Sequence, residues 1–508
     1  MNPSSLLLAT LALLFVSAAL LVPKDWGWGA VAAVLAASLL CGIKCPMPIE
    51  QPPDQETGLR HQLSAGQMAM VSVGGSIGTG LLLGSGAAIH IAGPALILTY
   101  LIGAFLAWTV TSALGELASA HPGAGSFGLY ADLYLNSWAG FVARYGYWFA
   151  LVVAVGAELV AASTYSRYWF PALPSIVWVV LYSALLLLIN LRPVGDYGSF
   201  ELWFAMIKVA TIVVFILAGA SLLLTGRASP QYVNHGGLFP NGPVSPLLAV
   251  SFPLFSFLGL EMVAISSGEA RATREIPRAT KIMFALLAFL YIGSTAVLVG
   301  FLPWNRAGVA QSPFVTVFVV AGIPAASTLM NFVVLTAALS GANANLYAAS
   351  RMMFSLARGG HAAPALGRLN ASGSPRLALL VSGIGVPLAL MSEHWAPQSA
   401  FLWLIGASLS GGMLAWCVAL SAHISFRRRL SPEDLAVLVM RAPGGAVASA
   451  IGLIGILLAV ASTWWVPQTR ITVVSGLPYL VILSLAYFFM VKRKQFAAKP
   501  GKATVHDS

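Results

Sequence analysis

Long apolar runs, repeated from one end of the chain to the other, most strongly restrict what this sequence can fold into. A helix of about 20 apolar residues crosses a bilayer, and runs of this length are too long for the strands of a membrane barrel. Only 8% of the 508 residues are charged, whereas a soluble domain carries about 25%. The sequence therefore predicts an all-α integral membrane protein. Fourteen runs can be marked, at about 6–22, 27–43, 65–88, 94–118, 138–165, 174–191, 201–224, 245–268, 282–302, 326–356, 377–393, 400–424, 446–464 and 473–491.

The basic residues predict how these helices are oriented. The net charge of +11 could suggest a nucleic-acid partner, but the lysines and arginines lie mostly in short loops between the apolar runs. If residue 1 is cytoplasmic, 19 of the 27 fall in cytoplasmic loops and 5 in outside loops, while Arg144, Lys208 and Arg351 lie inside helices. Cytoplasmic loops of membrane proteins are enriched in basic residues. We therefore expect a multi-pass protein of the cytoplasmic (inner) membrane, with both termini cytoplasmic and no nucleic-acid partner.

The first two apolar runs have three interpretations. We prefer an extra N-terminal transmembrane hairpin over residues 1–46, followed by a cytoplasmic polar segment over residues 47–63. A signal peptide would need a basic n-region and a small-x-small cleavage site, which this sequence lacks. A natural start at Met47 would remove the hairpin. The orientation of the remaining helices would stay the same, because the loss of an even number of spans leaves the next loop on the same side of the membrane.

Four glycines in seven residues interrupt the third run. The sequence GGSIGTG at residues 74–80 lies in the middle of a membrane span, and each interior glycine weakens a helix by about 1 kcal/mol relative to alanine. Unwound backbone at membrane depth is tolerated where it is buried in protein or lines a watery cavity. Two other interpretations are open. Gly80 and Gly84 fit a helix-packing motif. The segment 74–78 fits the nucleophile elbow of hydrolases, although the elbow needs a preceding strand.

A second weak point lies at residues 253–259, PLFSFLG, just before Glu261. Proline removes a backbone donor and glycine loosens the helix. The two weak points lie in the first and sixth runs counted from residue 65, and the orientation above gives these runs opposite directions. Interrupted helices in corresponding positions of two inverted halves are typical of secondary transporters. Free N–H groups at one break attract a carboxylate and free carbonyls at the other attract an ammonium, so a zwitterionic amino acid fits both.

At these residues the sequence resembles the amino acid permease family of the amino acid, polyamine and organocation (APC) superfamily. The resemblance extends from about residue 60 to residue 494, and its strongest pieces are 74–86, 114–117, 122–130, 201–209, 255–261 and 350–353. It implies a leucine-transporter-type 5+5 inverted-repeat fold with 12 core transmembrane helices. The implied domains are inverted repeat 1 at 64–226 (core helices 1–5), inverted repeat 2 at 244–426 (core helices 6–10), core helices 11–12 at 444–491 and a basic cytoplasmic tail at 492–508.

The resemblance also implies a substrate site at the two weak points. The first would hold the substrate carboxylate on the backbone around Ser76, Thr79 and Gly80. The second would hold the ammonium on the carbonyls near Phe255, Ser256 and Leu258. Phe257 or Leu260 would face the side-chain pocket or the gate. The complete implied substrate-binding set is Ser76, Ile77, Gly78, Thr79, Gly80, Phe255, Ser256, Phe257, Leu258, Gly259, Leu260 and Glu261.

Two charged residues inside the apolar runs are candidates for proton coupling. A charge at the bilayer centre costs at least about 2.5–3.5 kcal/mol, so each needs a partner or a purpose. The resemblance implies that Lys208 holds the place that a sodium ion occupies in sodium-coupled relatives. We expect Lys208 and Glu158 to couple proton movement to transport. The alternative for Lys208 is a fixed cation that ties the fifth core helix to the first.

Other charged residues within the helices have structural explanations. Glu116 lies near the cytoplasmic end of its helix and fits a structural pair or a cap as well as a functional role. Arg144 and Arg351 are expected to reach towards the membrane interface, because long basic side chains snorkel. Glu261 matches an acidic position of the family and could exchange protons or line the substrate path.

Together these features predict a secondary transporter that takes up amino acids by proton-coupled symport, through alternating access around the broken core helices 1 and 6. Leu260 stands where the family usually has threonine, which favours a neutral or large apolar substrate. An amino acid exchanger without proton coupling is the alternative. From another class, a non-transporting amino acid receptor would normally have a larger cytoplasmic domain. No cluster of His, Asp, Glu or Cys has catalytic or metal-ligand spacing, so no enzyme activity, metal or cofactor is predicted. The oligomeric state is left open.

Overall fold

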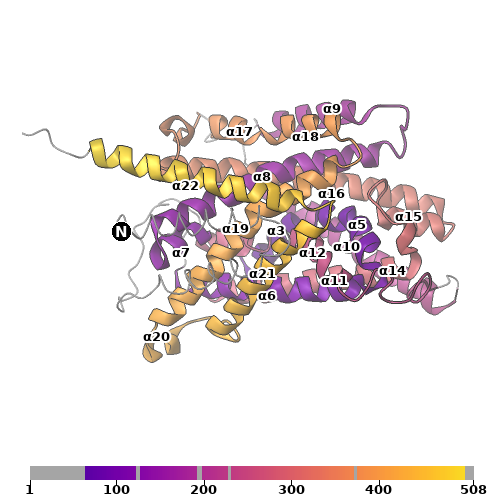
Figure 1. Ribbon diagram of the computed structural model, residues 1–508, viewed down its shortest axis with the longest axis horizontal. Coiled ribbons are helices and arrows are strands. Elements are labelled where there is room, and N and C mark those ends of the chain that lie inside the picture. Colours follow the sequence, from indigo (N-terminus) through magenta and orange to yellow (C-terminus); the bar gives the residue numbers. More distant parts are fainter. Residues whose placement is uncertain (1–62, 122–125, 191–196, 227–229, 371–374, 498–508) are drawn as a thin grey trace, which may run out of the picture.

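The protein is helical in the computed structural model, which describes residues 63–121, 126–190, 197–226, 230–370 and 375–497. Figure 1 shows the long helices packed together, with α9, α17 and α18 along one edge. Nine helices in the described part of the chain are long and apolar enough to cross a membrane, which confirms the all-α membrane class. The twelve-helix count and the inverted repeat stay predictions. The predicted hairpin 1–46 and most of the polar segment 47–63 lie outside the described residues, as does the end of the basic tail.

The helices keep the labels of Figure 1. In chain order they are α3 (Ala65–Ser76), α4 (Thr79–Leu82), α5 (Gly84–Ala92), α6 (Leu96–Ala120), α7 (Ser126–Tyr134), α8 (Ser137–Ser166), α9 (Ser175–Asn190), α10 (Tyr197–Leu224), α11 (Ser245–Leu248), α12 (Ser251–Ser256), α13 (Met262–Ile265), α14 (Glu275–Phe301), α15 (Pro313–Val320), α16 (Pro324–Arg358), α17 (Arg376–Ser382), α18 (Gly385–Trp395), α19 (Ala400–Arg429), α20 (Pro432–Val437), α21 (Gly445–Ser462) and α22 (Ile471–Ala497).

Some elements differ from the predicted runs. α14 begins at Glu275, so Arg278 and Lys281, expected in a loop, lie in its first turns. The run predicted at 377–393 is divided between α17 and α18, because the helix stops at Ser382 and resumes at Gly385. Two helices, α7 and α20, are too short to give an apolar run of spanning length. α7 packs against α8 and α19, whereas α20 begins with a local capping box formed by Ser431 and Asp434.

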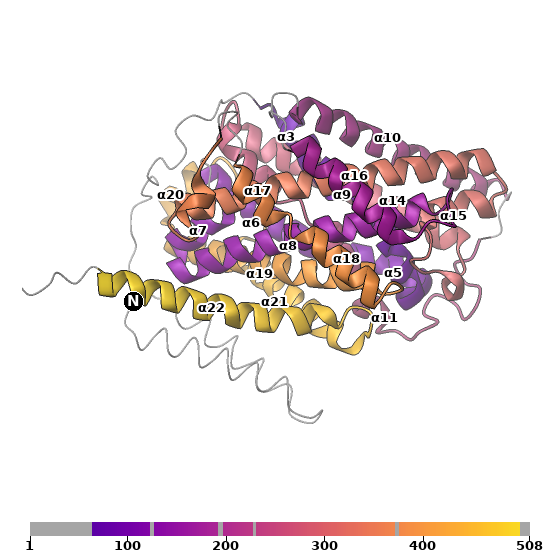
Figure 2. The same cartoon turned by 90° about the horizontal axis from the view of Figure 1, so that it is seen from above.

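Glycines let α8 approach its neighbours closely. α8 packs against both α16 and α19. A Cβ atom on Gly411 of α19 would collide with the carbonyl oxygen of Gly146 on α8, and a Cβ atom on Gly385 of α18 would collide with the backbone of Val152. Small residues at such crossings are characteristic of membrane helices, because lipid supplies no hydrophobic force between them. Figure 2 shows α22 along one edge of the molecule, where it also contacts α8.

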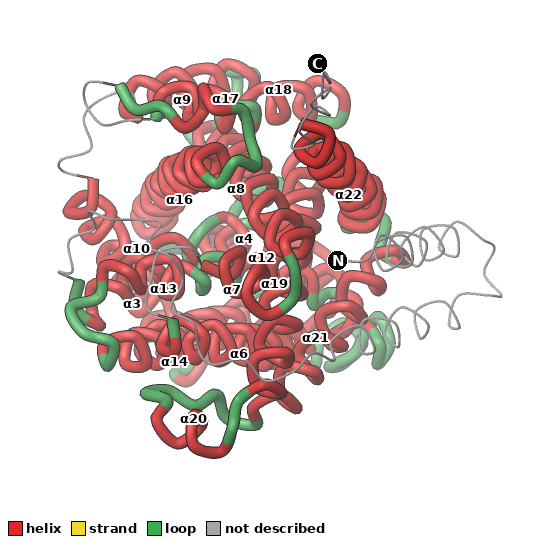
Figure 3. Tube along the Cα trace, turned by 90° about the vertical axis from the view of Figure 1, so that its left-hand side faces the viewer, coloured by secondary structure: helices red, strands yellow, loops and turns green. Residues whose placement is uncertain are grey.

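Both predicted helix breaks are present. Residues 77–78 separate α3 from α4, and residues 257–261, which form turns, separate α12 from α13. Figure 3 shows α4, α12 and α13 in the middle of the molecule, surrounded by longer helices. The interrupted segments are therefore enclosed by protein, as unwound backbone in a membrane requires.

Candidate functional site

The two breaks pack directly against each other at glycine residues. Gly259 has a φ of 109°, which lies in the region that favours glycine, and a Cβ atom there would lie 2.7 Å from the Oγ of Ser76. A Cβ atom on Gly80 would likewise lie 2.7 Å from Cδ1 of Phe255. Neither position leaves room for a side chain. The close contact of the two breaks therefore depends on glycine on both sides.

One tyrosine hydroxyl joins the two helices that stop at the breaks. The hydroxyl of Tyr291 on α14 lies 2.8 Å from the carbonyl oxygens of both Ser76 and Ser256, the last residues of α3 and α12. Carbonyls at a helix C-terminus have no partner within the helix. A hydroxyl has one hydrogen, so Tyr291 donates to these two carbonyls in alternation or shares the hydrogen between them. The carbonyl of Ser256, predicted to meet the substrate ammonium, thus has an internal partner.

The carboxyl group of Glu158 lies where the substrate carboxylate was predicted. Glu158, on α8, is 4% exposed, and its Oε1 accepts a hydrogen bond of 3.2 Å from the backbone N–H of Thr79. The carboxyl group fits because neighbouring residues are glycines: a Cβ atom on Gly78 would lie 2.5 Å from Oε1, and one on Gly341 would lie 3.1 Å from Cδ. A substrate can reach the N–H of Thr79 only if Glu158 moves away.

Lys208 reaches the first break from α10. Its Nζ donates a 2.9 Å hydrogen bond to the carbonyl of Gly74 in α3, and the residue is 3% exposed. This bond ties α10 to α3, as the fixed-cation alternative requires. Lys208 also lies close enough to Glu158 for their charges to interact. Proton coupling by these two residues stays a prediction.

The second break carries a carboxyl group of its own. Glu261 is fully buried. Its Oε1 accepts a 3.0 Å hydrogen bond from the N–H of Gly259, and its Oε2 accepts one of 3.2 Å from the indole N–H of Trp416 on α19. These bonds hold the turn between α12 and α13 and fix its position against α19.

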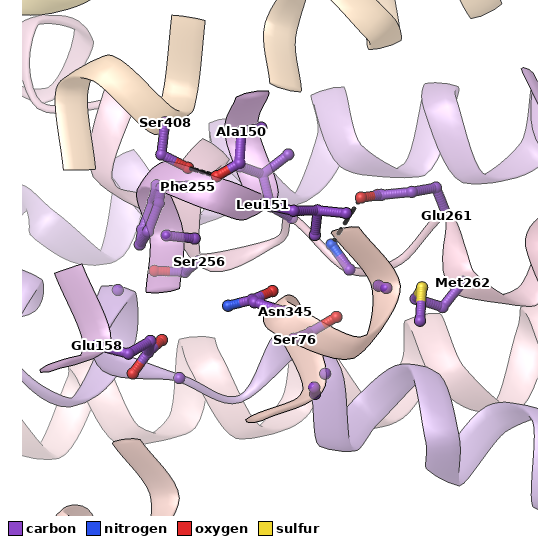
Figure 4. Close-up of a pocket in the computed structure, with 18 of the residues that line it drawn as sticks. Ser76, Ala150, Leu151, Glu158, Phe255, Ser256, Glu261, Met262, Asn345 and Ser408 are labelled. Carbon is purple, nitrogen blue, oxygen red and sulfur yellow. Dashed lines mark hydrogen bonds between the residues drawn. The ribbon is translucent and has the colours of Figure 1, made fainter. Parts of the chain in front are cut away.

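A partly open cavity lies between the two breaks, with about 620 Å³ of empty space when the adjoining open solvent is included. Figure 4 shows the residues that line it. Most of the predicted site residues line it, namely Ser76, Gly78, Gly80, Glu158, Phe255, Ser256, Leu258, Gly259 and Glu261. The others point into packed protein and are at most 3% exposed; they are Ile77, Thr79, Phe257, Leu260 and Lys208. Neither Phe257 nor Leu260 therefore lines the cavity in this structure, and the alternative that one of them faces the gate stays a prediction. The ring of Phe257 instead packs against Tyr291, with ring centroids 4.8 Å apart.

Much of the cavity wall was not predicted. The missed residues are Gly75, Tyr147, Ala150, Leu151, Ala154, Met262, Ala344, Asn345, Ala348 and Ser408. Those on α8 follow a pattern that the sequence does contain: Tyr147, Leu151, Ala154 and Glu158 are spaced by four, three and four residues, which places them on one helix face. The lining residues on α16 and α19 show no comparable spacing in the sequence, and they are far from both breaks along the chain.

The other charged residues lie away from the cavity. Glu116 is buried, and its Oε1 lies 2.6 Å from Nε of Arg427 on α19, which confirms a structural pair. Arg144, on α8, lies 2.7 Å from Asp132 of α7, and its side chain is 12% exposed. Arg144 is therefore paired with Asp132, and its reach towards the membrane interface stays a prediction. Arg351 is exposed.

Comparison with known proteins agrees with this geometry. The model of the family described as amino acid permease matches residues 67–498. The gamma-aminobutyric acid permease of Bacillus subtilis (strain 168) is 34% identical over 416 residues, which are 80% of this chain and 89% of the relative. The aromatic amino acid transport protein AroP of Escherichia coli (strain K12) is 35% identical over 453 residues, 88% and 98% of the two chains. The amino-acid permease RocC of Bacillus subtilis (strain 168) is 35% identical over 450 residues, 86% and 96%.

Proposed function

The chain belongs to the amino acid permease family, and we propose that it takes up a neutral amino acid across the cytoplasmic membrane by proton-coupled symport. The observation that carries this proposal is the cavity between the two helix breaks, which residues of both breaks line. Leu260, on which the sequence-based substrate preference rested, does not line the cavity. Support for a large side chain comes instead from the relative named as an aromatic amino acid transport protein.

We propose alternating access around the two breaks, within a 5+5 inverted repeat. We propose that one end of the cavity is covered where the hydroxyl of Ser312 donates a 2.7 Å hydrogen bond to the carbonyl of Leu82 at the end of α4. We place this end outside, since the nearby Arg306 falls in a loop predicted to be outside. In the other direction the lining continues to Tyr147 and Met262, so the cavity would face the cytoplasm in this form.

The contacts of Glu158 support a coupling mechanism. A charged carboxylate accepts hydrogen bonds about twice as strong as a neutral group does. When Glu158 takes up a proton, its hold on the N–H of Thr79 weakens, and that N–H becomes available to the substrate carboxylate. Proton and substrate would therefore bind together. Lys208 supplies the positive charge that faces Glu158 in the unprotonated state.

Transport by the purified protein in proteoliposomes tests this proposal. We expect an inward proton gradient to drive uptake of a labelled neutral amino acid above its equilibrium level, and an uncoupler to abolish the accumulation. The variant Lys208→Met should lose accumulation, whereas Lys281→Met, at an exposed position on α14, should accumulate substrate as the wild type does. Full accumulation by Lys208→Met would refute the coupling role. Failure to transport any of the twenty amino acids would refute the function.

Exchange without proton coupling is the second candidate, and the bond from Lys208 to Gly74 favours it, because a lysine held in this way can act as a fixed cation. An exchanger would show counterflow that survives an uncoupler, with no net uptake. A receptor would bind an amino acid, detected as a thermal shift, and show neither counterflow nor net uptake.

A further inference from the structure

The polar side chains of the cavity wall differ in whether the described part of the protein already forms hydrogen bonds with them. The hydroxyls of Ser76, Ser256 and Ser408 line the cavity but donate hydrogen bonds to backbone carbonyls. The carboxyl groups of Glu158 and Glu261 hold the backbone of the two breaks. Asn345 of α16 also lines the cavity, and among the described residues its side-chain amide has no hydrogen-bond partner. Its donor and acceptor are both free for a ligand.

The position of Asn345 places this amide beside the substrate. Figure 4 shows its side chain between Ser256 and Ser76, within the cavity. Gly341 lies one helical turn before Asn345 on the same face of α16, and a Cβ atom there would lie 3.1 Å from the carboxyl carbon of Glu158. The amide therefore lies about one turn of α16 from the group that holds the first break.

The surroundings of Asn345 suit the side chain of the substrate better than its charged amino or carboxylate group. The backbone groups and the carboxylates that can recognise a zwitterion lie at the two breaks and on Glu158. The walls from α8 and α16 instead present small methyl groups that leave space for a bulky substrate side chain, those of Ala150, Ala154, Ala344 and Ala348. A neutral amide adds little to the recognition of charge, but it discriminates sharply between side chains with and without a hydrogen-bonding group.

We propose that Asn345 is a specificity-determining residue, whose amide hydrogen-bonds a polar group on the side chain of the transported amino acid, such as a phenol hydroxyl, an indole N–H or a carboxamide. This inference rests on the proposed function. It narrows the substrate class from neutral amino acids in general to neutral amino acids with a hydrogen-bonding side chain.

Matched pairs of amino acids in proteoliposomes test the inference. Tyrosine and phenylalanine, threonine and valine, and glutamine and methionine differ little in size and differ in one polar group. For the transported pairs we expect the wild type to prefer the polar member in kcat/KM by about tenfold, which one neutral hydrogen bond supports. Asn345→Leu, similar in size but unable to form hydrogen bonds, should lose this preference and keep or gain transport of the apolar member.

The control is Asn343→Leu on the same helix. Asn343 does not line the cavity, and its Oδ1 accepts a 2.6 Å hydrogen bond from Asn190 of α9, so its loss should change stability without changing the preference ratio. If Asn345→Leu does not fold, as judged by thermal unfolding, Asn345→Ala replaces it. A wild type without polar preference, or an unchanged ratio in the folded Asn345 variant, would overturn the inference and leave amino acid transport standing. A wild type that transports no amino acid would overturn the function and the inference with it.

Discussion

At the scale of single residues, the glycines of the first break differ in what they do. The sequence presents them as equal points of weakness in a helix. In the fold, Gly78 leaves room for the carboxyl group of Glu158, and Gly80 leaves room for Phe255, whereas a Cβ atom on Gly75 would meet nothing within 4 Å. Of these three glycines, Gly78 and Gly80 are required by tertiary contacts and Gly75 is not.

The variant Gly78→Ala tests whether transport depends on the position of the Glu158 carboxyl group. The Cβ atom of the alanine would lie 2.5 Å from Oε1 of Glu158, so the carboxyl group would have to leave the N–H of Thr79. A hydrogen bond to a charged group contributes about 1.5–3 kcal/mol. Its loss should weaken the proposed coupling between proton and substrate, and we expect proton-driven accumulation in proteoliposomes to fall roughly tenfold or more. The control is Gly66→Ala, near the start of α3, where a Cβ atom would meet nothing within 4 Å. It should transport normally; an equal loss in both variants would contradict this explanation.

At the scale of elements, α3 and α12 end in the same way. Each stops at a serine whose hydroxyl donates to the carbonyl four residues earlier, at 2.9 Å for Ser76 and 3.0 Å for Ser256. Such bonds back to the preceding turn destabilise and bend helices slightly. The backbone carbonyls of both serines then meet Tyr291. The two breaks therefore share a local construction and one hydrogen-bond donor, in keeping with their corresponding places in the two predicted halves.

Removal of this donor should loosen both breaks at once. Tyr291→Phe keeps the ring but leaves two buried carbonyls without their donor. We expect a lower midpoint of thermal unfolding in detergent, equivalent to about 1–2 kcal/mol for interhelical hydrogen bonds in a membrane. Tyr100 provides the control, since it is also buried and its hydroxyl makes one longer contact, 3.4 Å to the Oγ of Ser256. Tyr100→Phe should cost less, and a larger loss there than in Tyr291→Phe would argue against the shared-donor role.

At the scale of the whole molecule, ion pairs connect the helices that surround the two breaks. The pair of Glu116 and Arg427 joins α6 to α19, and Glu116 also accepts a hydrogen bond from the backbone N–H of Ala442, which precedes α21. The pair of Arg144 and Asp132 holds α7 against α8. None of these residues lines the cavity. They fix the positions of the helices around the two breaks.

The orientation of the whole molecule can be tested with reporter fusions in a bacterial host. The excess of 19 basic residues over 5 predicts a cytoplasmic C-terminus, because basic loops stay on the cytoplasmic side. A green fluorescent protein fused after Ser508 should fluoresce, and alkaline phosphatase at the same place should be inactive. Alkaline phosphatase fused after Pro240, in a loop predicted to be outside, serves as the active control. An active phosphatase after Ser508 would reverse the predicted orientation.

The sequence by itself determined the membrane class, most of the long helices and both helix breaks. The membrane class and the long helices follow from the length of the apolar runs, and the breaks follow from glycine and proline within these runs. Both features can be read from residues that are adjacent in the sequence. Only the tertiary structure decided which side chains take up the backbone groups freed at the breaks. Glu158 is 79 residues from Thr79 and Tyr291 is 215 residues from Ser76, so the packing of whole helices brings these partners together. For the same reason the sequence did not reveal that Asn345 lines the cavity or that Phe257 and Leu260 turn away from it.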